Sequence, residues 1–291
     1  MTAKRVWEAT APDGKMLPTQ IVRAPDGRLW VGDTFNARFA IFTADGKFVE
    51  YWGKSGSGAG EFNFVRSNGD ACGGIAFAPD GSFFVLEAGN RRVQKFDKDR
   101  HLVKAWGEAG SEPGQYMGPT AIAMSPDGEV YVLDEIRGVI ERYDLDGNIV
   151  GQMDPFGEHR HGMATTNTLF VDRRGDIYVS LIEPNEVVRL DRDGTLRQVY
   201  GAPDSGDGAF ADQPGAMATD SEGRLFATQW RTPGVLVFDR DGAYLGGWGT
   251  AGEGSTDVGL PTAVLTDDDG NVYLGDGAAK RIRKFAVTIG S

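Results

Sequence analysis

The residues that could carry out chemistry in this chain gather in its middle third. Asp134 and Glu135 follow the apolar run VYVL, and Arg137 comes two residues later. His159 and His161 lie further on, in the run FGEHRHGM. A carboxylate base, an imidazole acid and a guanidinium that holds an anionic group are sufficient for proton transfer on a small molecule. These residue types favour a lyase or a hydrolase, with Asp134 as the first candidate for the base and His161 for the complementary acid.

Each of these residues also has a simpler explanation. His159 and His161, spaced i, i+2, could bind a metal ion or exchange protons, or they could be two histidines of a solvent-exposed loop. For the acids and Arg137 of this blade, the simpler explanation is ordinary drift between repeats. The choice depends on the elements that position them.

A motif of strand, tight turn and strand recurs six times, for example in APDGRLWVGD, SPDGEVYVLD and DDDGNVYLGD. Its turn glycines are Gly27, Gly81, Gly128, Gly175, Gly223 and Gly270. Subtracting successive positions gives intervals of 54, 47, 47, 48 and 47 residues. A second hairpin signal, as in FTADGKF and YDLDGNI, follows in each of the first five units. Four strands repeated at this spacing are typical of a propeller blade. We expect one all-β domain over residues 1–291, a six-bladed β-propeller with four-stranded blades.

The sixth unit ends after its third strand, and the missing strand is found at the other end of the chain. The run from Lys4 to Ala9 resembles the run from Lys47 to Trp52, which is the fourth strand of the first unit. We expect the N-terminal strand to complete blade six. This closure would remove two exposed sheet edges at once.

Alignment of the blades on the turn glycine shows where the repeat is broken. The sixth residues after the glycine are Asp33, Glu87, Asp134, Leu181, Gln229 and Asp276, and the eleventh are Arg38, Arg92, Val139, Glu186, Gly234 and Arg281. Blades one, two and six should therefore each hold an ion pair between an acid and an arginine. Blades three to five depart from the pattern, either by ordinary drift or because a functional site lies there. Asp134 has lost its arginine, and burial without that partner would raise its pKa toward the working range of a base.

One face of such a propeller carries the long, varied connections between blades, and binding usually resides on loops of this kind. We expect a site at the mouth of the channel on this face, over blades three to five, with Arg137 or Arg231 holding an anionic group of a small-molecule ligand. The other residues expected to bind the substrate are Phe62, Phe64, Tyr116, Asn167, Gln229 and Trp230. The segment from Gly53 to Gly73 would cover part of the channel mouth.

The same face supports a second class of function, a non-enzymatic scaffold that binds a ligand or a protein through exposed apolar side chains. The candidates for that role are Phe62, Phe64, Tyr116, Met117, Phe156 and Trp230. A deep pocket over the channel would favour the enzyme, and a broad apolar patch would favour the scaffold.

Two runs, GDTFNARFAIFTADGKFVEYWG and LEAGNRRVQKFDKDRHLVKAWG, resemble NHL repeats. The connectors WGKSGSGAGEF and WGEAGSEPGQY are similar to those of bacterial peptidyl-hydroxyglycine amidating lyases. The resemblance implies zinc-binding histidines eight residues before the turn glycine, but those positions are Thr19, Gly73, Thr120, Asn167, Gly215 and Thr262. Gluconolactonase-like propellers imply Glu, Asn and Asp around a divalent ion, and only Asn167 offers a match. We expect no structural zinc and no cofactor, and we leave a divalent ion in the channel open.

The composition of the chain limits the kinds of molecule that it is expected to bind. The formal net charge of −12 disfavours nucleic acid, because phosphate contacts need a surface rich in Lys and Arg. Cys72 is the only cysteine, so no internal disulfide forms. No apolar run has the length of a signal peptide or of a membrane helix. We expect a monomer in the cytoplasm that binds neither nucleic acid nor membrane.

Overall fold

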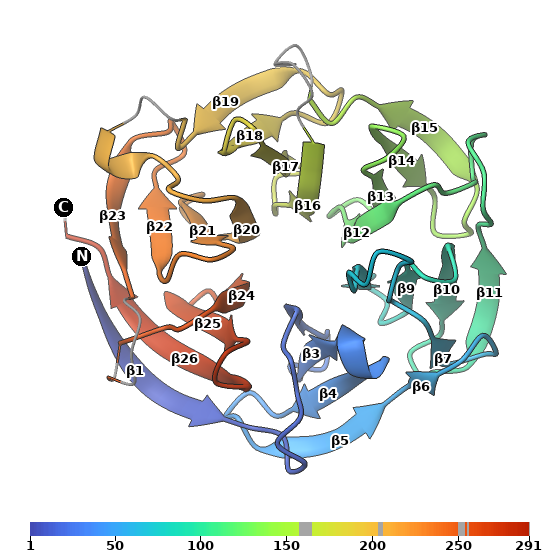
Figure 1. Ribbon diagram of the computed structural model, residues 1–291, viewed down its shortest axis with the longest axis horizontal. Helices are drawn as coiled ribbons and strands as arrows, with labels where there is room; N and C mark the ends of the chain where they lie inside the picture. The colour runs from blue at the N-terminus through green and yellow to red at the C-terminus, as the bar shows by residue number, and fades with distance from the viewer. Residues whose placement is uncertain (157–164, 203–205, 250–253, 255, 291) are drawn as a thin grey trace.

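Six four-stranded antiparallel sheets are arranged in a ring in the computed structural model (Figure 1). The structure describes residues 1–156, 165–202, 206–249, 254 and 256–290, and it leaves out the side chains of residues 165–167. The six-bladed all-β propeller predicted from the repeat is therefore confirmed.

The strands follow the predicted units, with the innermost strand of each blade first in the chain. Blades one to three contain β2 (Gln20–Arg23), β3 (Leu29–Asp33), β4 (Arg38–Phe42) and β5 (Phe48–Trp52); β8 (Gly73–Phe77), β9 (Phe83–Glu87), β10 (Arg92–Phe96) and β11 (Leu102–Trp106); and β12 (Pro119–Met124), β13 (Val130–Asp134), β14 (Val139–Tyr143) and β15 (Ile149–Met153). Blades four to six contain β16 (Thr165–Val171), β17 (Ile177–Ile182), β18 (Glu186–Leu190) and β19 (Leu196–Tyr200); β20 (Pro214–Thr219), β21 (Leu225–Gln229), β22 (Val235–Phe238) and β23 (Tyr244–Trp248); and β24 (Pro261–Thr266), β25 (Asn271–Asp276), β26 (Arg281–Thr288) and β1 (Thr2–Ala9).

The N-terminal strand closes the ring, as the sequence predicts. Strand β1 pairs antiparallel with β26, from Thr2 opposite Thr288 to Ala9 opposite Ile282. The two ends of the chain therefore lie side by side in Figure 1. This pairing covers the edge that β26 would otherwise expose.

Tight turns fix the two faces of the ring. At Gly27 the backbone φ is +85°, and its N–H donates to the carbonyl of Ala24 at 2.9 Å. A side chain rarely adopts this left-handed conformation, so glycine is favoured there. Because successive strands are antiparallel, the first and third loops of each blade lie on one face, which we call the hairpin face. The loops between the second and third strands, with the connections between blades, form the connector face.

Aromatic residues fill the space between neighbouring blades. At the contact of blades one and two, the ring of Trp30 lies 5.5 Å from that of Phe83, and Trp52 lies 5.1 Å from Phe96. Both contacts are within the range of favourable aromatic pairs. A short parallel pair, β6 (Lys54–Ser55) and β7 (Glu61–Phe62), folds the connector between these blades back onto them. No helix of the described residues is long and apolar enough to cross a membrane.

Candidate functional site at the connector face

A buried acid at the end of the second strand of a blade holds the connector that enters the same blade. Asp33 accepts the N–H of Leu17 at 2.9 Å, and Glu87 accepts the N–H of Asn63 at 3.0 Å. The predicted ion pairs are confirmed in three blades. Their distances are 2.8 Å for Arg38 and Asp33, 2.7 Å for Arg92 and Glu87, and 3.7 Å for Arg281 and Asp276.

Asp134 belongs to the same series even though its arginine is missing. One carboxylate oxygen accepts the N–H of Met117 at 2.8 Å, and the other accepts those of Gly118 and Arg137, both at 3.0 Å. The side chain is completely buried. Backbone donors therefore take the place of the arginine that blade three has lost. Its role as a base stays a prediction.

In blade five, Gln229 holds the incoming connector, as the buried acids do in the other blades. Its Oε1 accepts the N–H groups of Ala211 at 2.7 Å and of Asp212 at 3.3 Å, and the residue is 4% exposed. The next residue, Trp230, is 48% exposed. In blade four, Leu181 at this position is completely buried in an apolar cluster. The residues that break the repeat in blades four and five are thus a core residue, Leu181, and a residue that holds a connector, Gln229. Trp230 and its exposed neighbour Arg231 have neither role.

Arg137 points into the protein. Its guanidinium contacts Glu141 at 2.6 Å and the carbonyl of Gln115 at 2.7 Å, and its side chain is 9% exposed. Glu141 is completely buried and also accepts the N–H of Gly114 at 3.1 Å. This network holds the connector between blades two and three. A contact between Arg137 and a substrate stays a prediction.

Three aromatic residues expected to contact a substrate are core residues. Phe62, Phe64 and Tyr116 are all 0% exposed, so that expectation is wrong. Phe62 packs 5.2 Å from Trp52, because the β6–β7 pairing turns it toward the contact of blades one and two. The Tyr116 hydroxyl donates to that of Tyr143 at 2.8 Å, and burial raises its pKa. Phe156, a candidate for the scaffold function, is also buried.

An ion pair between Glu135 and Arg66 is partly open to solvent on the connector face. The two charged groups are 3.1 Å apart, with side-chain exposures of 26% for Glu135 and 16% for Arg66. The N–H of Glu135 donates to the carbonyl of Gly118 at 3.0 Å, directly before the innermost strand β12. Arg66 lies in a turn closed by the bridge between Val65 and Ala71, directly before the innermost strand β8. Both residues therefore lie where connectors reach the centre of the ring.

Sequence reasoning identified Glu135 but missed Arg66. Arg66 lies in the second part of the longest connector, which has no equivalent in the other blades, so no alignment of repeats could single it out. Cys72 lies close by, and burial raises the pKa of its thiol to about 11. The thiol is therefore protonated near neutral pH and is a weak nucleophile.

Two candidate acids cannot be placed. His159 and His161 lie outside the described residues, as does the side chain of Asn167. No hydrogen bond or ion pair between described residues joins Asp134, Glu135 or Arg137 to the candidates of blade five.

The described residues do not fit a divalent ion in the channel. They contain no group of three or more His, Cys, Asp or Glu side chains that could hold a metal. At the five described positions eight residues before the turn glycine, the chain offers hydroxyl groups or no side chain at all: Thr19, Gly73, Thr120, Gly215 and Thr262. Carboxylate and imidazole ligands are the usual donors for such ions. We derive no chemical step through a metal.

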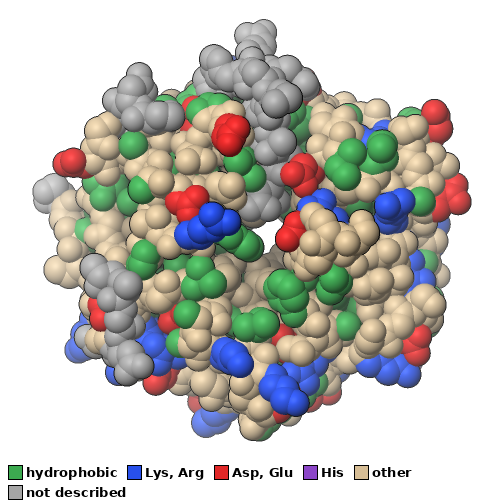
Figure 2. Space-filling view, viewed as in Figure 1, with side chains coloured by type: hydrophobic (Ala, Val, Ile, Leu, Met, Phe, Trp, Pro, Cys, Tyr) green, Lys and Arg blue, Asp and Glu red, His purple; other side chains and the backbone are tan. Residues whose placement is uncertain are grey.

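Exposed apolar side chains also mark the connector face. They are Phe35 at 51%, Val65 at 38%, Met117 at 43%, Ile136 at 59% and Trp230 at 48% exposure. Each belongs to a connector or to a loop between second and third strands. Figure 2 shows apolar and charged side chains around a central hollow on this face.

Comparison with known proteins finds one family model that is similar to part of this chain. Residues 75–207, within blades two to four, match the SMP-30/Gluconolactonase/LRE-like region. A comparison with curated protein sequences finds no match. Neither an NHL protein nor an amidating lyase stands among the similar structures described below, so that likeness stays a resemblance of sequence.

Solved structures show the same fold at low identity. Virginiamycin B lyase from Staphylococcus aureus has a TM-score of 0.65 at 13% identity, over 99% of this chain and 100% of that one. A streptogramin B lyase has a TM-score of 0.65 at 14% identity, over 96% of this chain and 81% of that one. A putative gluconolactonase has a TM-score of 0.64 at 15% identity, over 99% of this chain and 92% of that one.

Proposed function

We propose that this protein is a small-molecule enzyme of the lyase or hydrolase type, with its site on the connector face around Glu135 and Arg66. The observation that carries the proposal is their partly exposed ion pair at the centre of the ring. Of the two acids singled out in blade three, Asp134 is buried and bonded to three N–H groups, whereas Glu135 has one charged partner and reaches solvent. Charged groups that solvent reaches at a concave centre suit a binding site.

Each residue has a distinct role in this proposal. An anionic group of the substrate takes the place of Glu135 beside the Arg66 guanidinium, which can form two parallel hydrogen bonds with it. The released Glu135 carboxylate then acts as the general base and accepts a proton from the substrate. Asp134 positions Glu135, because it holds the start of β12 and the turn that carries Glu135. His161 or His159 acts as the acid, and Trp230 and Arg231 contact the substrate from blade five.

The fold supports this class of function. Two structures with the same fold are named as a streptogramin B lyase and a virginiamycin B lyase, and one as a putative gluconolactonase. The family match over residues 75–207 includes Glu135 but not Arg66, which precedes it. The first probes for activity are therefore gluconolactone and the type B streptogramin quinupristin, which is bound in one of the lyase structures.

The test replaces the carboxylate without changing its shape. Glu135→Gln should lower turnover of whichever probe is a substrate by about 100-fold or more, because general-base catalysis has that share. Its melting temperature should stay near that of the unchanged protein. Glu50→Gln is the matched control, because Glu50 forms a comparable exposed ion pair with Arg100 at 2.7 Å, away from the site. Full activity of Glu135→Gln would refute the assignment.

A second candidate function rests on the exposed apolar residues of the same face. If the protein is a binding scaffold, neither probe is turned over, and an apolar dye binds the connector face. Ile136→Ser and Trp230→Ser would then weaken binding of the dye. Rapid turnover of either probe would exclude a purely structural scaffold.

A further inference from the structure

A hollow of about 160 Å³ lies on the hairpin face, between blades three and four. Three arginines line it: Arg173 and Arg174 from the first turn of blade four, and Arg192 from its second turn. Asp127 and Tyr131 of blade three line the opposite wall. The hollow is on the opposite face from the proposed active site. We call it the Arg174 pocket.

Arg174 breaks a rule that the other blades keep. The residue before the first turn glycine is an acid in every other blade: Asp26, Asp80, Asp127, Glu222 and Asp269. Such an acid can cap its turn, as Asp26 does by accepting the N–H of Arg28 at 3.0 Å. In blade four, as in blades five and six, an acid three residues before the glycine caps the turn. This acid is Asp172, which accepts the N–H groups of Arg174 and Asp176 at 2.8 and 2.9 Å. The turn therefore makes no demand on the Arg174 side chain.

The guanidinium of Arg174 has no acidic partner among the described residues. Its neighbours do. Arg192 contacts Glu129 at 2.9 Å and also pairs with Asp127, and Arg173 pairs with Asp268 of blade six. These pairs hold two guanidinium groups at the rim of the pocket.

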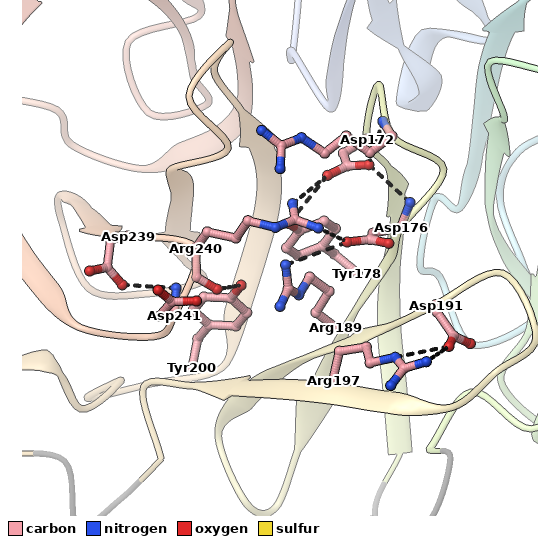
Figure 3. A network of polar contacts seen from close by, with 11 residues as sticks. Asp172, Asp176, Tyr178, Arg189, Asp191, Arg197, Tyr200, Asp239, Arg240 and Asp241 are labelled. Carbon is pink, nitrogen blue, oxygen red and sulfur yellow. Dashed lines mark hydrogen bonds and ion pairs between the residues drawn. The ribbon is translucent and has the colours of Figure 1, made fainter.

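The acids of the adjoining network of blades four and five are paired with other arginines. Figure 3 shows Arg240 beside Asp172 and Arg189 beside Asp176. The charged groups of each pair are 3.4 Å apart. Arg197 pairs with Asp191 on the second turn of blade four. These acids are therefore already engaged and do not neutralise Arg174.

The charges around the pocket do not balance. Three arginines line it, Arg173, Arg174 and Arg192, and Arg142 shares the carboxylate of Glu129 with Arg192. These four arginines have only three acidic partners, Asp127, Glu129 and Asp268, and none of the three pairs with Arg174. One positive charge is left over, in a protein whose formal net charge is −12. An excess of cations at one hollow of an acidic protein attracts an anion there.

We propose that the Arg174 pocket binds a small oxyanion of the phosphate class, as free phosphate or as a phosphate monoester. Guanidinium groups present planar pairs of donors that match phosphate oxygens, and three of them line this wall. A volume of about 160 Å³ holds several water molecules but is smaller than the pockets of drug-sized ligands. The ligand is therefore small. Burial raises the pKa of Tyr131 to about 12, so its phenol adds no negative charge to the pocket.

Calorimetric titration of the full chain tests this, with inorganic phosphate, glycerol 3-phosphate and acetate as separate probes. We expect one saturable site for phosphate or its monoester. Tighter binding of glycerol 3-phosphate would identify a monoester, and equal or tighter binding of inorganic phosphate would identify free phosphate. Acetate should bind at least about 10-fold more weakly, because it offers fewer charge-assisted hydrogen bonds.

Arg174→Gln should weaken phosphate binding about 10-fold or more. Arg174→Glu, which restores the acid of the other blades, should abolish it. Arg28→Gln is the matched control, since Arg28 is an exposed arginine beside the equivalent turn of blade one, and it should bind as the unchanged protein does. Unchanged melting temperatures would show that all three variants fold. The proposal is overturned if neither phosphate probe saturates a site, if acetate binds equally well, or if both Arg174 variants bind like the control.

Discussion

Asp134 can serve the fold and still determine where the neighbouring Glu135 lies. It is completely buried and accepts three backbone N–H groups, two from the connector before β12 and one from the turn after β13. An asparagine would keep one acceptor oxygen and would place an NH₂ group against N–H donors. A buried donor left without an acceptor costs about 1–3 kcal/mol.

We therefore expect Asp134→Asn to lower the free energy of unfolding by about 1–3 kcal/mol in a urea titration. Asp33→Asn is the matched comparison, because Asp33 accepts a connector N–H in blade one. It should cost a similar amount. If Asp134→Asn unfolds at the same urea concentration as the unchanged protein, the three hydrogen bonds do not hold the connector.

Cys72 gives a prediction about reactivity. A pKa of about 11 leaves roughly one thiol in a thousand ionised at pH 8, whereas an ordinary cysteine is about a quarter ionised there. Alkylation by iodoacetamide at pH 8 should be about 100-fold slower in the folded protein than in urea. Mass spectrometry over a pH series should show the rate rising toward pH 11. Equal rates in the folded and unfolded protein would contradict the burial of this thiol.

The site was only partly predictable for a physical reason. Alignment of the repeats identified Asp134, Gln229 and Glu135 because side-chain types can be compared between blades. It could not show that Asp134 and Gln229 bind backbone N–H groups, since those donors are the same in every residue. Phe62 and Phe64 look like exposed loop residues in the sequence, and only the folding of their connector onto blades one and two buries them.

At the scale of the element, strand β1 is the closure of the ring, and its loss should be costly. Its pairing with β26 extends over nearly the whole strand. The ring of Trp7 also lies 5.8 Å from that of Tyr273 and packs against Gly46 of blade one. Removal of β1 therefore exposes a sheet edge and also takes an aromatic ring from the contact of blades one and six.

We expect deletion of residues 1–10 to lower the melting temperature sharply and to cause association in size-exclusion chromatography, because an open edge pairs with other chains. Val6→Ser is the control, since Val6 lies in the same strand with 54% exposure and should change little. A truncated protein that melts like the full chain and stays monomeric would refute the closure as a source of stability.

The elements themselves were predictable because each depends on local chemistry. The six turn glycines have positive φ, and the residues on either side alternate or run as apolar strands. Closure was predictable because the incomplete last unit and the extra first strand match in pattern. The path of the inserted segment before β8 was not predictable, because it has no counterpart in the other blades.

At the scale of the whole molecule, acids in the turns of the hairpin face should set its stability in acid. The N–H of His101 donates to Asp97, and that of Asn148 donates to Asp144, and these hydrogen bonds lower the pKa of each carboxyl below its ordinary value of 3.8. Asp191 and Asp267 also have lowered pKa values: backbone and side-chain hydrogen bonds outweigh the opposing effect of burial. Hydrogen bonds of this kind recur around the ring.

The direction of the pH dependence follows from these shifts. A carboxyl whose pKa is lower in the folded state stabilises the protein fully above its unfolded pKa, and this contribution is lost as the pH falls through the folded value. The melting temperature should therefore change little between pH 7 and pH 5, and it should decrease when the pH falls below about 4.

The double variant Asp97→Asn, Asp144→Asn should make that decrease less steep, because two of the titrating groups are gone. Calorimetry from pH 7 to pH 3 measures both effects, and a melting temperature that stays constant to pH 3 would mean that these turn acids contribute nothing. Because the acids recur in successive blades, the loss should be spread around the ring, and the unfolding transition should stay a single one as it moves to lower temperature.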